Sequence, residues 1–160
     1  MAEIKHDATI SWRNDGGDFL RGKYSRLHEW RFDGGATVPA SASPSVVPLP
    51  LSSAEAVDPE EAFVASLASC HMLTFLDLAR RAGHVVLSYE DQAYGVMERL
   101  GAGRHAVAKV VLRPKIAFET EPEPAALTDL HHRAHELCFI ANSVKSEVVV
   151  EGIAAPAEGN

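Results

Sequence analysis

Two cysteines, Cys70 and Cys138, offer the most distinctive chemistry in this chain of 160 residues. Each falls in an apolar stretch of helical character, one at 64–73 and the other at 134–140. Thiols distant in sequence can form one redox centre when the fold brings them together, because a thiolate attacks peroxides and a second thiol closes a disulfide. A free cysteine is more commonly a small core side chain. The two residues alone leave both interpretations open.

A metal site is a further interpretation of the same region. On a helix, His131, His135 and Cys138 would fall within about 60° of one another, and His71 and Cys70 could complete a tetrahedral set of ligands. Neither a CxxC nor an HExxH spacing is present. A His/Cys metal-binding protein therefore stands as an alternative, and our main hypothesis assigns no metal.

Composition restricts the partners. Hydrophobic residues make up 46% of the chain and the formal net charge is −7, which repels phosphate backbones and anionic lipid surfaces. The first seven residues lack the apolar region of a secretory signal, and polar residues interrupt the apolar stretch at 62–79. We therefore predict a cytoplasmic protein that binds neither nucleic acid nor membrane. A disulfide there would be transient and catalytic rather than structural.

The elements that must position the thiols form a mixed pattern. Alternating apolar residues predict strands at 8–13, 19–32, 85–97, 106–118 and 147–152. The first two would form a hairpin, and the next two would be joined through Gly101–Gly103. Residues 36–57 are rich in Ala, Ser and Pro, which predicts an extended arm or loop, and residues 154–160 read as a frayed tail.

Two long helices are expected to carry the cysteines. Asp58 and Pro59 are a typical helix start, Glu61 completes a capping box, and Gly83 is a natural stop after Ala82. A second helix is predicted from 121 to 143, which would place Cys138 inside it at the margin of its buried face. Together these elements predict a single α+β domain over 1–160, with antiparallel sheets and two long helices.

The sequence resembles a known family in two separate motifs. Residues 58–70 read Asp-Pro-Glu followed, ten residues after Glu60, by Cys70 in a helix of small apolar residues. Cys138 stands late in the second helix, ahead of Ala141-Asn142-Ser143 and the closing strand. Both motifs resemble the OsmC/Ohr family, the osmotically induced and organic hydroperoxide resistance proteins. The resemblance implies an intertwined α+β homodimer and a cysteine-based peroxidase of the oxidative stress response.

The resemblance also implies roles for individual residues. Cys70 matches the peroxidatic thiol, Cys138 the resolving thiol and Glu60 the family glutamate. Arg21, in Leu20-Arg21-Gly22-Lys23, best matches the family arginine, although Arg26 and Arg31 lie in the same predicted hairpin. The implied substrate is an organic hydroperoxide and no cofactor is implied. The implied reductant is a dithiol, for which the family suggests a lipoyl-bearing protein.

Helix geometry adds a condition to this assignment. Glu60 and Cys70 would lie about 15 Å apart along an unbroken helix. Either the helix breaks near 66–69, or Glu60 serves the Cys70 of a second subunit, which is the arrangement we predict. Phe139 stands where the family typically has Pro, and His28 or His71 could have been recruited to the pocket. The alternative from another class is a non-catalytic OsmC-like dimer that binds a hydrophobic ligand.

Overall fold

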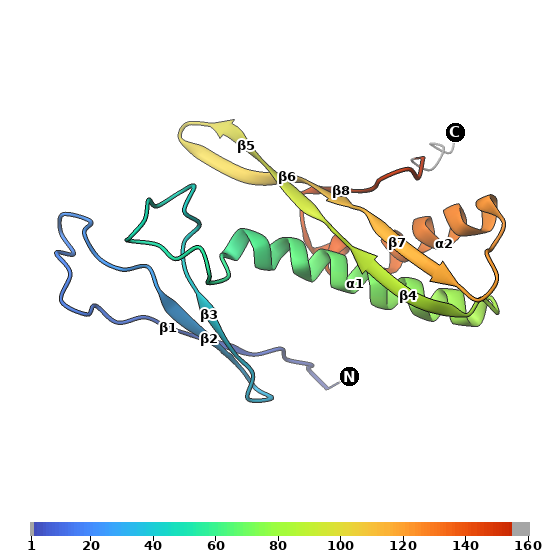
Figure 1. The fold of residues 1–160 in the computed structure, drawn as a ribbon, viewed down its shortest axis with the longest axis horizontal. Helices are drawn as coiled ribbons and strands as arrows, with labels where there is room; N and C mark the ends of the chain where they lie inside the picture. The colour runs from blue at the N-terminus through green and yellow to red at the C-terminus, as the bar shows by residue number, and fades with distance from the viewer. Residues whose placement is uncertain (1, 155–160) are drawn as a thin grey trace. The chain divides into compact units, whose positions relative to one another are not determined.

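Residues 2–154 are described by the computed structural model, in which the chain divides into two units, Met1–Ala62 and Phe63–Asn160 (Figure 1). Each unit is described by itself. The prediction of a single domain over 1–160 therefore stays a prediction. Residues 155–160 of the predicted frayed tail lie outside the described residues.

The first unit contains a three-stranded antiparallel sheet. Its strands are β1 (Ala8–Ser11), β2 (His28–Phe32) and β3 (Thr37–Ala40), in that spatial order. Ile10 pairs with Trp30, and Trp30 pairs with Val38, so β2 is the central strand. The turn from β2 to β3 contains Gly35 at a φ of 90°, a left-handed conformation that favours glycine.

The predicted strand at 19–32 is wrong for residues 19–27, which form a loop. Three aromatic rings pack together there: Phe19 and Tyr24 stack at 4.7 Å, and Trp12 meets Tyr24 edge-on at 5.5 Å. The Arg26 guanidinium lies 3.7 Å over the Tyr24 ring and donates to two carbonyls of the same loop. The apolar spacing that predicted a strand thus belongs to an aromatic cluster.

The segment at 36–57, predicted as an arm or loop, begins with β3 and then closes on itself. Val57 donates its amide to the Pro39 carbonyl, and the Ser41 amide donates to the Val57 carbonyl, each at 3.0 Å. Inside the loop, the Ser53 amide donates to Ser41 Oγ at 3.0 Å. These bonds bring the chain back beside β3 just before the first helix begins.

The first helix, α1 (Pro59–Arg81), confirms the predicted start and stop. The Glu61 amide donates to Asp58 Oδ1 at 2.8 Å and the Asp58 amide donates to Glu61 Oε2 at 3.1 Å, which is a reciprocal capping box. Gly83 follows the helix at a φ of 84°. The helix is continuous through residues 66–69, so the predicted alternative of a break there is wrong.

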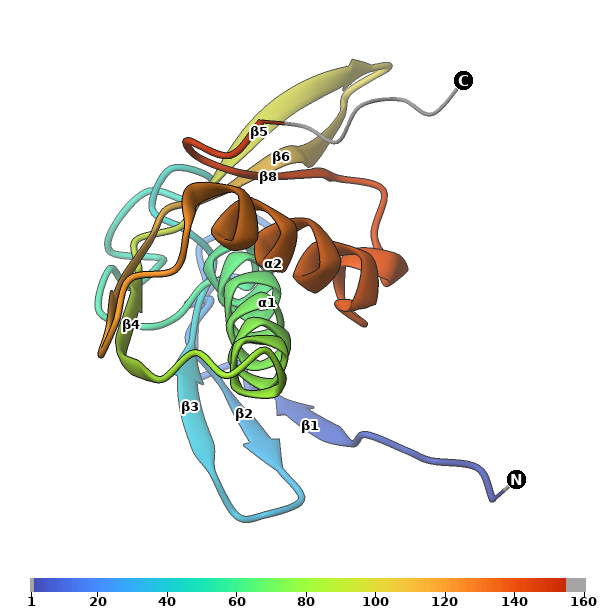
Figure 2. The ribbon, with the colours of Figure 1, turned by 90° about the vertical axis from the view of Figure 1, so that its right-hand side faces the viewer.

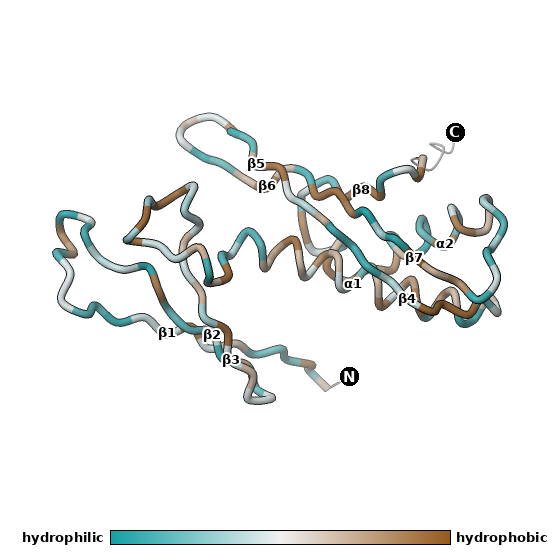
Figure 3. The backbone as a smooth tube through the Cα atoms, viewed as in Figure 1, coloured by the Kyte–Doolittle hydropathy of each residue, from teal (hydrophilic) through white to brown (hydrophobic). Residues whose placement is uncertain are grey.

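Past its acidic start, α1 is largely apolar (Figure 3). By length and composition it could cross a membrane, since it has 23 residues and an 18-residue window with a mean hydropathy of 1.5. A core helix meets the same criterion, and α1 does bury Leu67, Phe75 and Leu78 against other elements of the second unit.

The strands of the second unit form two small sheets. They are β4 (Val86–Asp91), β5 (Tyr94–Gly101), β6 (Arg104–Leu112), β7 (Pro114–Phe118) and β8 (Glu147–Val150). β4 pairs with β7, while β6 lies between antiparallel β5 and parallel β8. Each long strand predicted for the hairpin is therefore interrupted. The interruption is fixed by Asp91 Oδ1, which accepts the Arg113 amide at 2.7 Å, and by Pro114, which has no amide to donate.

The second helix, α2 (Pro124–Leu137), is shorter than predicted and is followed by a 3-10 turn at Ala141–Ser143. Cys138 has a ψ of 113°, which ends the helix. The Asn142 side chain donates to the Glu136 carbonyl at 2.9 Å and so satisfies a helix end that no glycine marks. The α+β class with two helices and antiparallel sheets is confirmed.

Hydrophobic packing in the second unit forms two clusters. One joins the second half of α1 to α2 and β7 through Phe75, Leu78, Ala79, Phe118, Leu130 and Ala134. The other joins the first half of α1 to β6 through Leu67, Val110 and Leu112, with Ile140 and Ala141 packed against it. Figures 1 and 2 show α2 passing beside the second half of α1. Along the chain, Cys70 of α1 and Cys138, which directly follows α2, each lie between residues of one cluster and residues of the other.

Replacing Asp58 by Ala removes the side-chain acceptor of the capping box. We expect the free energy of unfolding to fall by about 1 kcal/mol, the usual cost of losing an N-cap. Urea denaturation measures this, with Glu55→Ala as control because Glu55 is an exposed acid just before the cap. An unchanged midpoint for Asp58→Ala would show that the box does not stabilise α1.

Candidate functional site

Cys70 and Cys138 come together in the second unit, although 67 residues separate them in sequence. Cys70 lies near the middle of α1 and is half-buried, while Cys138 directly follows α2 and is 1% exposed. Cys70 is close enough to contribute to the raised pKa of the Cys138 thiol, and both thiols are free. The fold thus brings the predicted pair close together in the reduced state.

A tight turn holds the Cys138 sulfur. The Ala141 amide donates to Cys138 Sγ at 3.4 Å, and the Cys138 amide donates to the His135 carbonyl at 3.3 Å. Burial raises the pKa of the Cys138 thiol, and the amide of Ala141 opposes that shift only in part. Cys138 therefore stays protonated near neutral pH, and a protonated thiol is a poor nucleophile.

Beside the thiols, two histidines form a buried pair between the helices. His71 Nε2 lies 3.1 Å from His131 Nδ1, and the two rings stack with an interplanar angle of 6°. His71 is 1% exposed and His131 is 3% exposed. His131 also packs on Phe75, with ring centroids 4.5 Å apart. Of the two facing nitrogens one donates and the other accepts, an arrangement that two neutral imidazoles can make.

Burial and neighbouring charge keep both imidazoles neutral. The pKa of His71 is lowered to about 3, mainly by desolvation and to a smaller extent by the charges of His131 and His135. The pKa of His131 is lowered to about 4, mainly by desolvation and to a smaller extent by the charge of His132. Both groups thus remain uncharged well below neutral pH.

Glu60 and the three candidate arginines belong to the first unit. Glu60 is half-buried in the first turn of α1, so the unbroken helix keeps it about 15 Å from Cys70 along the axis. Arg21 is exposed and lies 3.7 Å from Asp18. Arg26 is held over Tyr24, and Arg31 lies 3.7 Å from Glu29. Which arginine faces Cys70 stays a prediction.

The remaining histidine candidate, His28, is fixed within the first unit. Its Nδ1 donates to the Arg26 carbonyl at 2.7 Å, while its Nε2 accepts from Trp30 Nε1 at 3.0 Å. Both ring nitrogens are therefore occupied by neighbours on and before β2. Across residues 2–154, no group of three or more His, Cys, Asp or Glu side chains is arranged to hold a metal ion.

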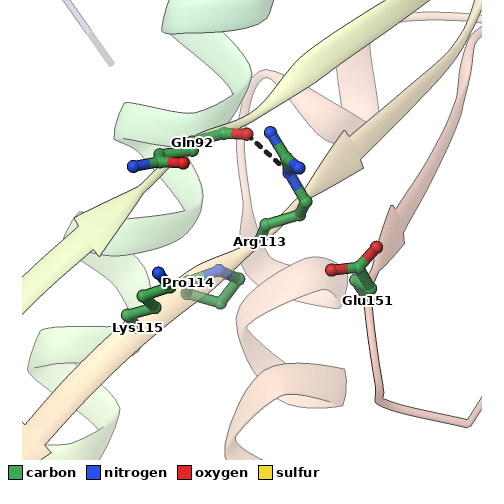
Figure 4. A pocket seen from close by; sticks show the side chains of 5 residues that line it. All are labelled: Gln92, Arg113, Pro114, Lys115 and Glu151. Carbon is green, nitrogen blue, oxygen red and sulfur yellow. Dashed lines mark hydrogen bonds between the residues drawn. The ribbon is translucent and has the colours of Figure 1, made fainter.

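A polar cavity of about 210 Å³ opens elsewhere in the second unit, where the β4–β7 and β5–β6 pairs meet. It is lined by Gln92, Arg113, Pro114, Lys115 and Glu151 (Figure 4). Arg113 Nε donates to the Gln92 carbonyl at 2.8 Å, which holds the guanidinium across one side. None of the predicted site residues lines this cavity, so it is separate from the thiol pair.

Comparison with known proteins supplies the family. The chain matches the OsmC-like protein family over residues 52–152. It is 50% identical to an OsmC-like protein of unknown function from Vibrio cholerae, over 93% of this chain and 99% of that chain, with a TM-score of 0.89. The chain belongs to the OsmC-like family. No curated protein matched the sequence.

More distant solved structures share the fold of this OsmC-like chain. An organic hydroperoxide resistance protein from Elizabethkingia anophelis is 16% identical over 93% of this chain and 94% of its own, with a TM-score of 0.69. The organic hydroperoxide resistance protein OsmC from Legionella pneumophila is 16% identical over 94% and 96%, with a TM-score of 0.64. At such identities the likeness concerns the fold alone.

Sequence reasoning found the thiols of this OsmC-like protein but missed the histidine pair. In the sequence His131 is a candidate metal ligand, yet it follows Leu130 and precedes Ala134 on the buried stripe of α2. A polar residue inside an apolar stripe needs a buried partner. His71, in the apolar part of α1, has the same need. That shared need was the signal that could have paired them.

The histidine pair predicts a pH dependence of stability. An unfolded histidine takes up a proton below about pH 6.5, whereas the folded pair does not, so folding opposes protonation. The free energy of unfolding that depends on the neutral pair is fully present above pH 6.5 and is lost as the pH falls toward the folded pKa values of about 3 and 4. Between pH 7 and pH 5, we expect the pair to lower the free energy of unfolding by at least about 2 kcal/mol.

Urea denaturation at several pH values measures this for the wild type and for the double variant His71→Leu/His131→Leu. The difference between their two curves should carry the dependence, because carboxylates titrate alike in both proteins. His105→Leu, at an exposed position on β6, is the control. Parallel curves for the wild type and the double variant would contradict the prediction.

Proposed function

We propose that this OsmC-like protein is a cysteine-based peroxidase that reduces organic hydroperoxides. One observation supports the proposal most directly: α1 and the segment after α2 bring two free thiols close together. Two reduced cysteines that lie close together can be oxidised together and reduced together, which is the basis of a thiol catalytic cycle. Family relationship adds organic hydroperoxide resistance proteins as fold neighbours.

The reaction balances with two thiols and one hydroperoxide. The Cys70 thiolate attacks the distal peroxide oxygen, the O–O bond breaks, and the departing alkoxide takes up a proton to leave as the alcohol. Cys70 is then a sulfenic acid. The Cys138 sulfur attacks the Cys70 sulfur, water leaves, and a disulfide remains. A dithiol reductant restores both thiols, and a lipoyl-bearing protein of the cytoplasm would serve.

Exposure supports the assignment of roles to the two thiols. Cys70 is the half-buried member and can meet a small peroxide, whereas Cys138 is enclosed and follows later in the cycle. Apolar side chains near both are open to solvent: Leu73 is 61% exposed and Phe139 is 81% exposed. Such neighbours favour a hydroperoxide with a hydrocarbon tail over hydrogen peroxide.

A homodimer would complete the site. Glu60 lies too far along α1 to reach the Cys70 of its own helix, and a thiolate needs a nearby cation to form at neutral pH. The small residues Ala65, Ser66 and Ser69 are exposed on α1, which would let another backbone approach closely. We therefore propose that Glu60 and the arginine, Arg21 in our assignment, serve the Cys70 of the second subunit, with Glu60 holding the guanidinium.

Single serine substitutions separate the two thiol roles. Cys70→Ser should abolish turnover of cumene hydroperoxide with a dithiol reductant, because no sulfur remains to attack the peroxide. Cys138→Ser should still consume about one equivalent per chain and then stall, since its sulfenic acid cannot close a disulfide. Peroxide consumption measures both variants. Wild-type turnover in Cys70→Ser would end the proposal, and peroxide binding without turnover in the wild type would favour a binding protein.

Subunit complementation tests the shared site. Glu60→Gln and Cys70→Ser should each be inactive, but a heterodimer of the two carries one site with both residues intact. Denaturing and refolding an equal mixture should recover about a quarter of the wild-type activity if subunits pair at random. Each variant refolded alone is the control. A mixture no more active than its parts would place Glu60 outside the Cys70 site of the partner.

A further inference from the structure

His71 and His131 occupy the same two elements as the two thiols. His71 directly follows Cys70 on α1, and His131 lies seven residues, about two helical turns, before Cys138 on α2. α1 therefore carries one cysteine and one buried histidine, while α2 carries a buried histidine and is directly followed by the other cysteine. The histidine bond and the nearby thiols are two places at which α1 meets α2 and the residue that follows it.

Of the contacts between α1 and α2, the one between the two histidines depends on direction as well as distance. Among the described residues, the bond between His71 Nε2 and His131 Nδ1 is the one side-chain hydrogen bond that joins α1 to α2. The other contacts between these helices, from Phe75, Leu78, Leu130 and Ala134, are apolar. Apolar packing tolerates small sliding and rotation, whereas a buried hydrogen bond between two planar rings fixes both distance and orientation.

Burying two imidazoles is costly unless they satisfy each other, and two leucines would fill such a space without that cost. A polar pair at this place is therefore poorly explained by stability. It is well explained if the helices need one fixed register. Cys138 directly follows α2, and its amide donates to the His135 carbonyl in the last turn, so the register of α2 decides where its sulfur lies.

We propose that the His71–His131 hydrogen bond is a positioning contact that holds Cys138 close to Cys70 and so favours closure of the disulfide. This rests on the proposed function in one respect, that the thiols form a disulfide as part of their activity. Neither histidine is assigned a proton transfer. Their role is to keep α2 in register on α1 while the thiols react.

The reduction potential of the Cys70–Cys138 disulfide tests the proposal without any peroxide. The protein is equilibrated in glutathione redox buffers and the oxidised fraction is measured. Removing the bond in His131→Leu should lower the effective concentration of one thiol at the other at least about tenfold, which raises the potential by about 30 mV. The exposed His105→Leu is the matched control and should keep the wild-type potential.

Two further variants keep the test decisive. His71→Leu/His131→Leu leaves no imidazole nitrogen unpaired, so it should fold where the single variant does not, and it should show the same rise. His131→Asn returns an amide atom to the place of Nδ1 and should bring the potential back toward that of the wild type. A double variant at the wild-type potential, or an Asn variant shifted as far as His131→Leu, would overturn the proposal.

The outcomes also separate this inference from the proposed function. If the histidine variants keep the wild-type potential and the wild type turns over peroxide, the positioning role alone is rejected. If the histidine variants have a raised potential but the wild type does not reduce cumene hydroperoxide, the peroxidase is rejected and the positioning role is kept. A wild type that forms no disulfide in any buffer would reject both.

Discussion

The meeting of α1 with the end of α2 is the constraint on which this account depends. One thiol is on α1 and the other directly follows α2, and the two hydrophobic clusters pack these elements together on either side of Cys70 and Cys138. Neither sulfur would be more than a small apolar group if the elements were apart. The chemistry is therefore a property of packing between elements, and no single motif contains it.

The sequence predicted those features that local rules determine. The start of α1 follows from Asp58 and Glu61, and its stop follows from Gly83, because capping and left-handed glycine act within a few residues. The sequence predicts an end of α2 that is too late, because the Asn142 side chain caps this end and no glycine marks it. It predicts a strand for the loop at 19–27, because aromatic clustering and strand alternation produce similar spacing.

The candidate site divides in the same way. Cys70 and Cys138 are recognisable by residue type alone, whereas Glu60 and Arg21 depend on the family motifs, and the closeness of the two thiols is visible only in the folded chain. The His71–His131 pair needed three dimensions as well, because its two members lie 60 residues apart. Sequence alone shows that each buried polar group needs a partner, but it does not say which residue the partner is.

The intact mass of the protein before and after one equivalent of cumene hydroperoxide tests the central claim most directly. The account predicts that each reduced chain loses the mass of two hydrogen atoms and that a dithiol reductant restores the original mass. It also predicts that peptide mapping finds Cys70 joined to Cys138. A chain whose mass does not change, or one that gains only oxygen while both thiols stay unlinked, would contradict it.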